Sequence, residues 1–167
     1  FNGKDLTGWT RVNDGAFVVT NGALHLEGGK GWLATIQPLT NFIFEAEWRG
    51  LETNYNSGIF VRAPLGGKPF PTNVWQVNLK QSAAGELLKG SQKIVTNTPT
   101  APAVGEWVKF RLEARGRTLA LSINGARAWA KRDNAWPETR AIAESCGVGG
   151  RCRCASMFMV VSSPVSV

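Results

Sequence analysis

The chain has 167 residues, of which 43% are hydrophobic and 19% are charged. This composition excludes a disordered chain, and the length suits one domain that is large enough to bury a core. The positive residues behind the formal charge of +7 are spread along the chain without a Lys/Arg-rich run or a nucleic-acid motif, so we expect no nucleic-acid partner. No long apolar run is present, so we expect no membrane insertion.

The first half of the chain has the pattern of short strands. Helical periodicity is nearly absent, and alternating runs separated by Gly, Pro, Asn and Asp predict an all-β structure. Residues 15–28 predict two strands joined by the turn Asn21-Gly22, which is a strong hairpin signal. Further strands are predicted within residues 31–36, 41–50, 57–64 and 74–80. A loop rich in Gly and Pro is expected over residues 65–72.

The second half predicts another pair of hairpins and then becomes irregular. Residues 106–116 and 118–130 predict strands, with turns at Arg115-Gly116 and Asn124-Gly125. Residues from Glu138 onward alternate poorly and hold three cysteines, Cys146, Cys152 and Cys154; this odd number predicts no disulfide framework. A last strand could lie within residues 157–167. Because no repeat or linker is visible, we predict a single β-sandwich domain over residues 1–167.

Residue parity sorts the side chains of each strand, because successive side chains point to opposite faces. Glu45 and Glu47 lie opposite the apolar side chains of their strand, and Gln76 and Asn78 do the same in theirs. We expect these polar side chains, with Arg62 from the strand between them, to gather on one sheet face. That face is either the solvated outside of a sandwich or a site for a hydroxyl-rich ligand, since amides, guanidinium groups and aromatic rings suit sugars.

Arg62 stands just before Pro64, which ends strand pairing because proline has no N–H. We expect its guanidinium to point onto the polar face and to serve a ligand or a carboxylate such as Glu47. On this hypothesis an Arg62→Ala change weakens ligand binding or activity and alters the unfolding free energy by less than about 1 kcal/mol.

Several motifs occur in a characteristic order: "FNGKDLTGW", "DGAFVVTNGALHLEG", "NFIFEAEWR", "NSGIFVRAP" and "GEWVKFRLEARGRTLALSINGA". Together, over roughly residues 1–135, they resemble the 3-keto-disaccharide hydrolase domain family. The resemblance implies a concanavalin A-like jelly-roll β-sandwich of two antiparallel sheets, one of them concave and holding a sugar. It also implies a bacterial exported protein, whether periplasmic, at the cell surface or secreted.

The resemblance further implies hydrolase or lyase chemistry on glycosides, often on 3-keto sugars, whose C3 ketone acidifies the proton at C2. In that chemistry Glu47 would act as base or acid, Arg62 would stabilise the enolate, and Gln76 would occupy a further catalytic position. The residues expected to orient sugar hydroxyls are Glu45, Asn56, Ser57, Asn78 and Lys89. A divalent cation could replace the arginine, but the sequence shows no persuasive ligand set, so no metal or cofactor is predicted.

The chain departs from the family pattern in two places. Relatives usually carry glutamate where this chain has Gln76, and an amide cannot accept a proton, so this domain could bind carbohydrate without turnover. From about Ala141 the closing strands of the family are not recognisable, which would expose a strand edge and favour a homo-oligomer. An exported glycoside-cleaving enzyme, a non-catalytic carbohydrate-binding module and a basic interaction domain remain as alternatives.

Overall fold

The computed structural model describes residues 1–96, 98, 102–134 and 157–161. Within these residues the larger sheet has seven strands, in the spatial order β12 (Ala126–Arg132), β11 (Thr118–Ile123), β10 (Val108–Arg115), β5 (Phe42–Gly50), β13 (Met157–Val161), β3 (Ala23–Gly28) and β2 (Ala16–Thr20). Neighbouring strands are antiparallel, except that β13 runs parallel to both β5 and β3.

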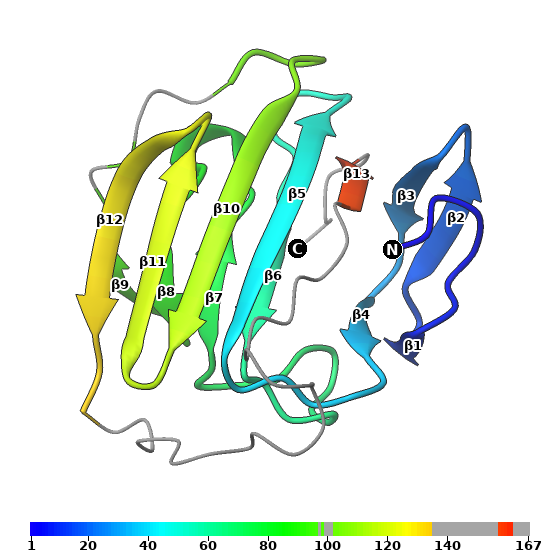
Figure 1. The fold of residues 1–167 in the computed structure, drawn as a ribbon. Coiled ribbons are helices and arrows are strands. Elements are labelled where there is room, and N and C mark those ends of the chain that lie inside the picture. Colours follow the sequence, from blue (N-terminus) through cyan, green and yellow to red (C-terminus); the bar gives the residue numbers. More distant parts are fainter. Residues whose placement is uncertain (97, 99–101, 135–156, 162–167) are drawn as a thin grey trace.

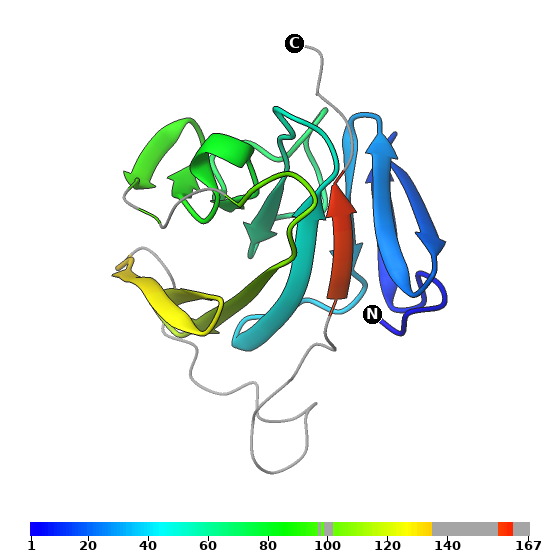
Figure 2. The same cartoon turned by 90° about the horizontal axis from the view of Figure 1, so that it is seen from above.

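A smaller sheet packs against the larger one. Its four antiparallel strands are β6 (Gly58–Val61), β7 (Trp75–Asn78), β8 (Leu87–Lys89) and β9 (Gln92–Val95), and a short 3-10 helix (Gln81–Ala83) connects β7 to β8. A separate pair, β1 (Trp9–Asn13) and β4 (Gly31–Thr35), is also antiparallel. Strands β12, β11, β10 and β5 lie in front of β9 to β6 in Figure 1, and Figure 2 shows the two layers from above. The predicted all-β sandwich is confirmed.

Local turn chemistry fixes the predicted hairpins. Asn21 and Gly22 have φ angles of 51° and 74°, and Asn124 and Gly125 have φ angles of 49° and 85°. Two consecutive positive φ values suit the right-handed twist of a two-residue hairpin, and Asn-Gly adopts them readily. Both turns are confirmed, whereas the turn between β10 and β11 lies one residue later than expected, at residues 116 and 117.

The hydrophobic core lies between the two layers. Trp48 of β5 is fully buried and packs edge-to-face against Phe110, with ring centroids 5.5 Å apart, and against Tyr55 at 5.6 Å. The smaller sheet contributes Val77 and Leu87, which are also fully buried. Each such side chain stabilises the fold by roughly 1.5–3 kcal/mol relative to its exposed state. The inward faces of β5 and β7 are therefore fixed, and their polar residues must point outward.

Strand β6 has one unpaired edge among the described strands. Ser57 and Leu79 exchange two main-chain hydrogen bonds, of 3.3 and 2.9 Å, so the alternation of an antiparallel pair turns the main-chain groups of Gly58 and Phe60 away from β7. Among the described strands β6 pairs with β7 alone. A cavity of about 1010 Å³ has residues of β4, β5 and β6 in its lining. The association that the atypical stretch from about Ala141 would favour stays a prediction.

Candidate functional site

The outer face of the smaller sheet carries an amide pair. Because Trp75 and Val77 point into the core, Gln76 and Asn78 point to the opposite side, and Gln76 Nε2 donates a 3.4 Å hydrogen bond to Asn78 Oδ1. Gly58 lies opposite Asn78 in the register, and a Cβ there would overlap Gln76 Nε2. The absence of a side chain at Gly58 therefore lets the Gln76 amide lie across β6. This part of the sequence-based parity prediction is correct.

Aromatic rings stand next to these amides. Phe60 lies directly opposite Gln76 in the register of β6 and β7. Its ring centroid is 5.9 Å from that of Trp32 on β4 and 6.2 Å from that of Phe70, and the Trp32 and Phe70 centroids are 6.3 Å apart. The three rings therefore form one cluster at the edge of the outer face.

A pocket of about 600 Å³ opens over this region, and its lining includes Phe60, Asn73, Gln76 and Gln92. We call the pocket and its neighbouring groups the amide–aromatic site, defined by Trp32, Phe60, Phe70, Asn73, Gln76, Asn78 and Gln92. Amide groups can donate and accept hydrogen bonds in the same plane, and aromatic rings offer an apolar surface. The site therefore has the groups that a hydroxyl-rich ring requires.

A buried carboxylate lies beside the amide pair. Glu86 lies in a bulge before β8, opposite Asn78, whose main-chain N–H donates a 2.9 Å hydrogen bond to the Glu86 carbonyl. The Glu86 residue is only 6% exposed. Lys93 Nζ lies 3.3 Å from both carboxylate oxygens and donates a hydrogen bond to Oε1. Within the described residues the buried Oε2 thus has the Lys93 ion pair but no hydrogen bond.

Sequence reasoning missed Glu86 because the bulge and the three-residue strand after it show no alternation. One signal was present, since Glu86 is the single acidic residue between Glu52 and Glu106. An isolated glutamate in a long stretch of amides, lysines and apolar residues indicates that its carboxylate has a specific partner in the fold.

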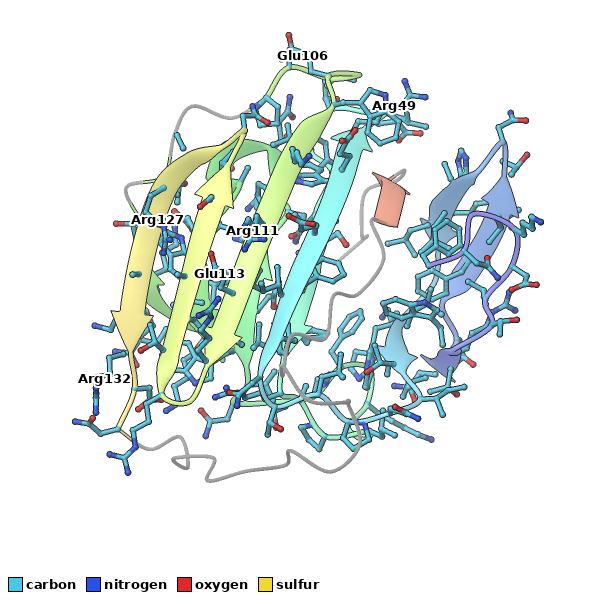
Figure 3. The ribbon with its side chains drawn as sticks, viewed as in Figure 1. Arg49, Glu106, Arg111, Glu113, Arg127 and Arg132 are labelled. Atoms are coloured by element: carbon cyan, nitrogen blue, oxygen red, sulfur yellow. The ribbon has the colours of Figure 1, made fainter. Side chains whose placement is uncertain are left out.

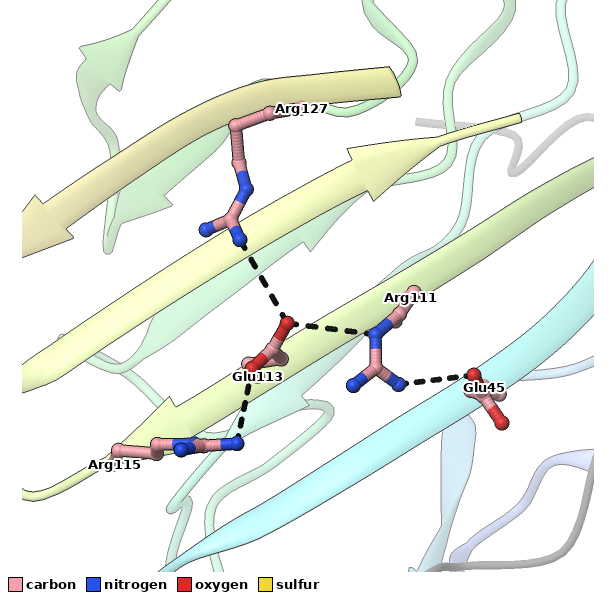
Figure 4. Close-up of polar contacts among 5 residues, drawn as sticks. All are labelled: Glu45, Arg111, Glu113, Arg115 and Arg127. Carbon is pink, nitrogen blue, oxygen red and sulfur yellow. Dashed lines mark hydrogen bonds and ion pairs between the residues drawn. The ribbon is translucent and has the colours of Figure 1, made fainter. Parts of the chain in front are cut away.

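Glu45 and Glu47 lie on a different sheet. They belong to β5, and their face is the outer face of the larger sheet, where Glu47 pairs with Lys109 in the register. Arg111 Nη1 lies 3.0 Å from Glu45 Oε1 and Arg111 Nε lies 3.4 Å from Glu113 Oε1, within a network that also includes Arg115 and Arg127 (Figures 3 and 4). The expectation that Glu45 and Glu47 share a face with Gln76 is therefore wrong, because the two strands belong to opposite layers.

Arg62 also departs from its expected place. Strand β6 ends at Val61, and Arg62 has a φ angle of 53°, so the alternation stops before it. Its Nε and Nη2 donate hydrogen bonds of 2.9 and 2.6 Å to the Thr40 carbonyl, and its Nη1 donates one of 2.7 Å to the Gly116 carbonyl. Burial lowers the pKa of this guanidinium. Arg62 thus holds two loops of the larger sheet and does not face Glu47.

The remaining predicted residues are divided between two places. Asn56 and Ser57 line the 1010 Å³ cavity at the start of β6. Lys89 shares the inner face with Trp75: its Nζ is 5.2 Å from the centroid of that ring and 3.6 Å from Asp133 Oδ2. Asn56 and Ser57 thus lie in a cavity that Gln76 also lines, and Lys89 lines both this cavity and the 600 Å³ pocket of the amide–aromatic site. The three cysteines lie outside the described residues.

The described residues lack a metal-binding cluster and a membrane-spanning helix. No cluster of three or more His, Cys, Asp or Glu side chains in the part of the chain that the structure describes could hold a metal ion. Nor do those residues include a helix with the length and apolar character needed to cross a membrane.

Comparison with known families decides the classification. The sequence model of the 3-keto-alpha-glucoside-1,2-lyase-like domain matches residues 1–148. The chain belongs to this family. The match confirms the family that the motifs indicated, and it extends past Ala141 into the stretch that departs from the family pattern. This lyase-like domain is therefore carbohydrate-related. No curated protein sequence matches the chain.

Two solved structures share the fold of this lyase-like domain. One is a candidate glycosyl hydrolase from Parabacteroides distasonis, with a TM-score of 0.65 and 20% identity over 81% of this chain and 71% of that one. The other is the carbohydrate-binding module CBM66 from Bacillus subtilis, with a TM-score of 0.63 and 17% identity over 81% of this chain and 85% of that one. At these identities the two structures show the sandwich fold alone.

Proposed function

We propose that this domain binds a gluco-configured carbohydrate in the amide–aromatic site on the outer face of β6 to β9. The observation that carries the proposal is the adjacency of the Gln76–Asn78 amide pair to the ring cluster of Trp32, Phe60 and Phe70. Amides supply both donors and acceptors for sugar hydroxyls, while the rings cover the apolar C–H face of the sugar.

Two comparisons support this proposal. The family description refers to alpha-glucosides, which suggests glucose as the sugar and an α linkage. One of the two similar folds is a carbohydrate-binding module, and the other is a candidate glycosyl hydrolase. A carbohydrate-binding module and a glycosyl hydrolase must both bind a sugar, so sugar binding is the function that the geometry supports best.

Cleavage of a 3-keto-α-glucoside is the second candidate. It is favoured by the family description and by the position of Glu86, because a carboxylate next to the amide pair could accept a proton. Gln76 cannot take that role, since an amide does not accept a proton near neutral pH.

The binding proposal is tested with a glycan array that covers gluco-configured mono- and disaccharides, followed by calorimetric titration of the tightest ligand. We expect Gln76→Ala to lower the affinity about 5- to 150-fold, which corresponds to about 1–3 kcal/mol for a lost ligand hydrogen bond. Gln37→Ala is the matched control, because Gln37 is exposed and lines neither cavity. A wild-type domain that binds no glycan, or a Gln76→Ala domain that binds as tightly as wild type, would contradict the proposal.

A further inference from the structure

We propose that the domain binds an extended, uncharged polypeptide segment of about five residues along the open edges of β4 and β6, as an added β-strand. This peptide site goes beyond the proposed function, because its ligand is a polypeptide and not a sugar. Three features of the fold carry it: two open strand edges that adjoin one cavity, the directions of their main-chain groups, and the apolar, charge-poor lining of that cavity.

The 1010 Å³ cavity adjoins an open edge of both strands. Among the described strands, β4 pairs with β1 alone and β6 pairs with β7 alone. Every residue of β4 and of β6 lines the cavity, whereas β1 contributes only Trp9 and β7 contributes only Trp75 and Gln76. The ring centroids of Trp32 on β4 and Phe60 on β6 are 5.9 Å apart. The cavity therefore lies on the side of each strand that faces away from its partner.

Main-chain groups of β4 point toward this open side. The Asp14 N–H donates a 3.2 Å hydrogen bond to the Lys30 carbonyl, and the Ile36 N–H donates one of 3.0 Å to the Gly8 carbonyl. In the register of β1 and β4, the even-numbered residues of β4 therefore bond to β1. Its odd-numbered residues, with Leu33 at the centre, direct their N–H and C=O groups away from β1. On β6 the even-numbered residues do the same relative to β7, so an added strand can pair with either edge.

The floor of the cavity is apolar. The larger sheet contributes Phe17 of β2, Leu24 of β3 and Phe44 of β5 to the lining, and all three side chains are buried. Protein interiors rarely keep voids much larger than a water molecule, so a space of this size with an apolar floor favours an occupant. Along an added strand every second side chain would point to this floor. The fold therefore selects a segment that is apolar at alternate positions.

The charges of the lining favour a neutral segment. They are limited to Arg62, Lys89 and Asp133. Arg62 donates hydrogen bonds to main-chain carbonyls, and Lys89 Nζ lies 3.6 Å from Asp133 Oδ2. A charged side chain over the apolar floor would lose hydration without gaining a counter-charge there. An acyl chain would suit the floor but would leave the main-chain groups of the open edges without partners, whereas a polypeptide strand satisfies both.

The test uses the full chain and a fluorescein-labelled peptide with the core Val-Thr-Val-Thr-Val between two lysines. The matched control peptide has the core Thr-Val-Val-Val-Thr, which keeps the composition close and the charge identical but removes the alternation. We expect fluorescence anisotropy to show at least about 10-fold tighter binding of the alternating peptide. At saturation, amide hydrogen exchange at Leu33 or Phe60 should slow by about tenfold or more, while amides of β11 on the other sheet should not change.

Leu33→Pro and Leu33→Ala form a matched pair of variants. Both remove the side chain, but only proline removes the N–H on the open edge, and the hydrogen bonds between β1 and β4 do not use that N–H. We expect the alternating peptide to bind Leu33→Pro about 10-fold more weakly than Leu33→Ala. Both variants are compared at a temperature where circular dichroism shows them folded, and the exchange measurement on wild type needs neither variant.

Several outcomes would overturn the peptide site. One is a wild-type domain that binds neither peptide, or binds both equally. Another is equal affinity of the two folded Leu33 variants, or unchanged exchange at both Leu33 and Phe60 in the saturated complex. A wild-type domain that dimerises and fails to bind the alternating peptide would assign the open edges to a second copy and would also overturn it. The glycan array is a separate readout, so its failure would contradict the proposed function and leave the peptide site standing.

Discussion

Tyr55 is a buried tyrosine whose hydroxyl has a raised pKa that can be measured. It is the one tyrosine of the chain, its side chain is fully buried against Trp48, and its hydroxyl makes no hydrogen bond within the described residues. Burial raises the pKa of this hydroxyl above its ordinary value of 10.0, because the ionised form loses its hydration. The folded state therefore holds the Tyr55 proton more tightly than the unfolded state does.

This pKa shift predicts a loss of stability in alkali. The contribution of Tyr55 is fully present below the unfolded pKa of about 10 and is lost as the pH rises toward the higher folded pKa. We expect the ultraviolet tyrosinate band to titrate above pH 10.0 in the folded domain and near pH 10.0 in urea. In Tyr55→Phe, thermal unfolding should depend less on pH in this range than in wild type. Titration of folded Tyr55 at its ordinary pKa would contradict the burial argument.

Arg62 illustrates how one φ angle decides the use of a side chain. With φ at 53° it leaves the plane of β6, and its three hydrogen bonds to main-chain carbonyls join residues that are far apart in sequence. Bonds from a charged donor to partly buried carbonyls are stronger than exposed ion pairs.

We therefore expect Arg62→Ala to lower the unfolding free energy by about 1–3 kcal/mol, because the Thr40 and Gly116 carbonyls lose their donor. Sugar affinity should stay within about twofold of wild type. Arg127→Ala is the control, since Arg127 makes an exposed 3.8 Å ion pair and its loss should change the unfolding free energy by less than about 1 kcal/mol. Urea unfolding measures the first effect and calorimetric titration the second. An Arg62→Ala domain of unchanged stability and weakened sugar binding would restore the interpretation that the sequence alone suggested.

At the scale of elements, local signals were sufficient for most of the longer strands and insufficient for the site. The Asn-Gly turns and the parity of β5 and β7 were predictable, because turn dihedrals and alternation depend on neighbours in the chain. Parity sorts the faces of one strand, however, and carries no information on which sheet that strand joins. Glu47 and Gln76 were each placed correctly within their strands and wrongly relative to each other.

Short and bulged elements account for part of what sequence reasoning missed, which also includes strand β1. Strands β8 and β9 have three and four residues, which is too short for alternation to be visible. The register shift between Leu87 and Leu88 and the bulge at Glu86 change which side chains share a face. Glu86 and Lys93 therefore meet for reasons that only the folded sheet reveals.

At the scale of the whole molecule, the two outer faces differ in chemistry. The larger sheet carries a charged network of Glu45, Arg111, Glu113, Arg115 and Arg127. The smaller sheet carries the Gln76–Asn78 amides, the Phe60 ring and the Glu86–Lys93 ion pair. The net charge of +7 belongs to the molecule as a whole and not to the amide–aromatic site in particular. A polyanion would respond to the overall charge, whereas a neutral sugar would respond to the smaller sheet.

This difference predicts how binding depends on salt. A neutral glycan held by hydrogen bonds and ring contacts should keep its affinity within about twofold between low and physiological ionic strength, because no counterions are released when it binds. A polyanion attracted by the net positive charge should instead bind more weakly as salt rises. Titrating the tightest array ligand, and heparin as the polyanionic reference, over the same salt series separates the two behaviours. If the glycan lost affinity as steeply as heparin, the overall charge would be the recognition element, and a basic interaction domain would replace the amide–aromatic site as the better account.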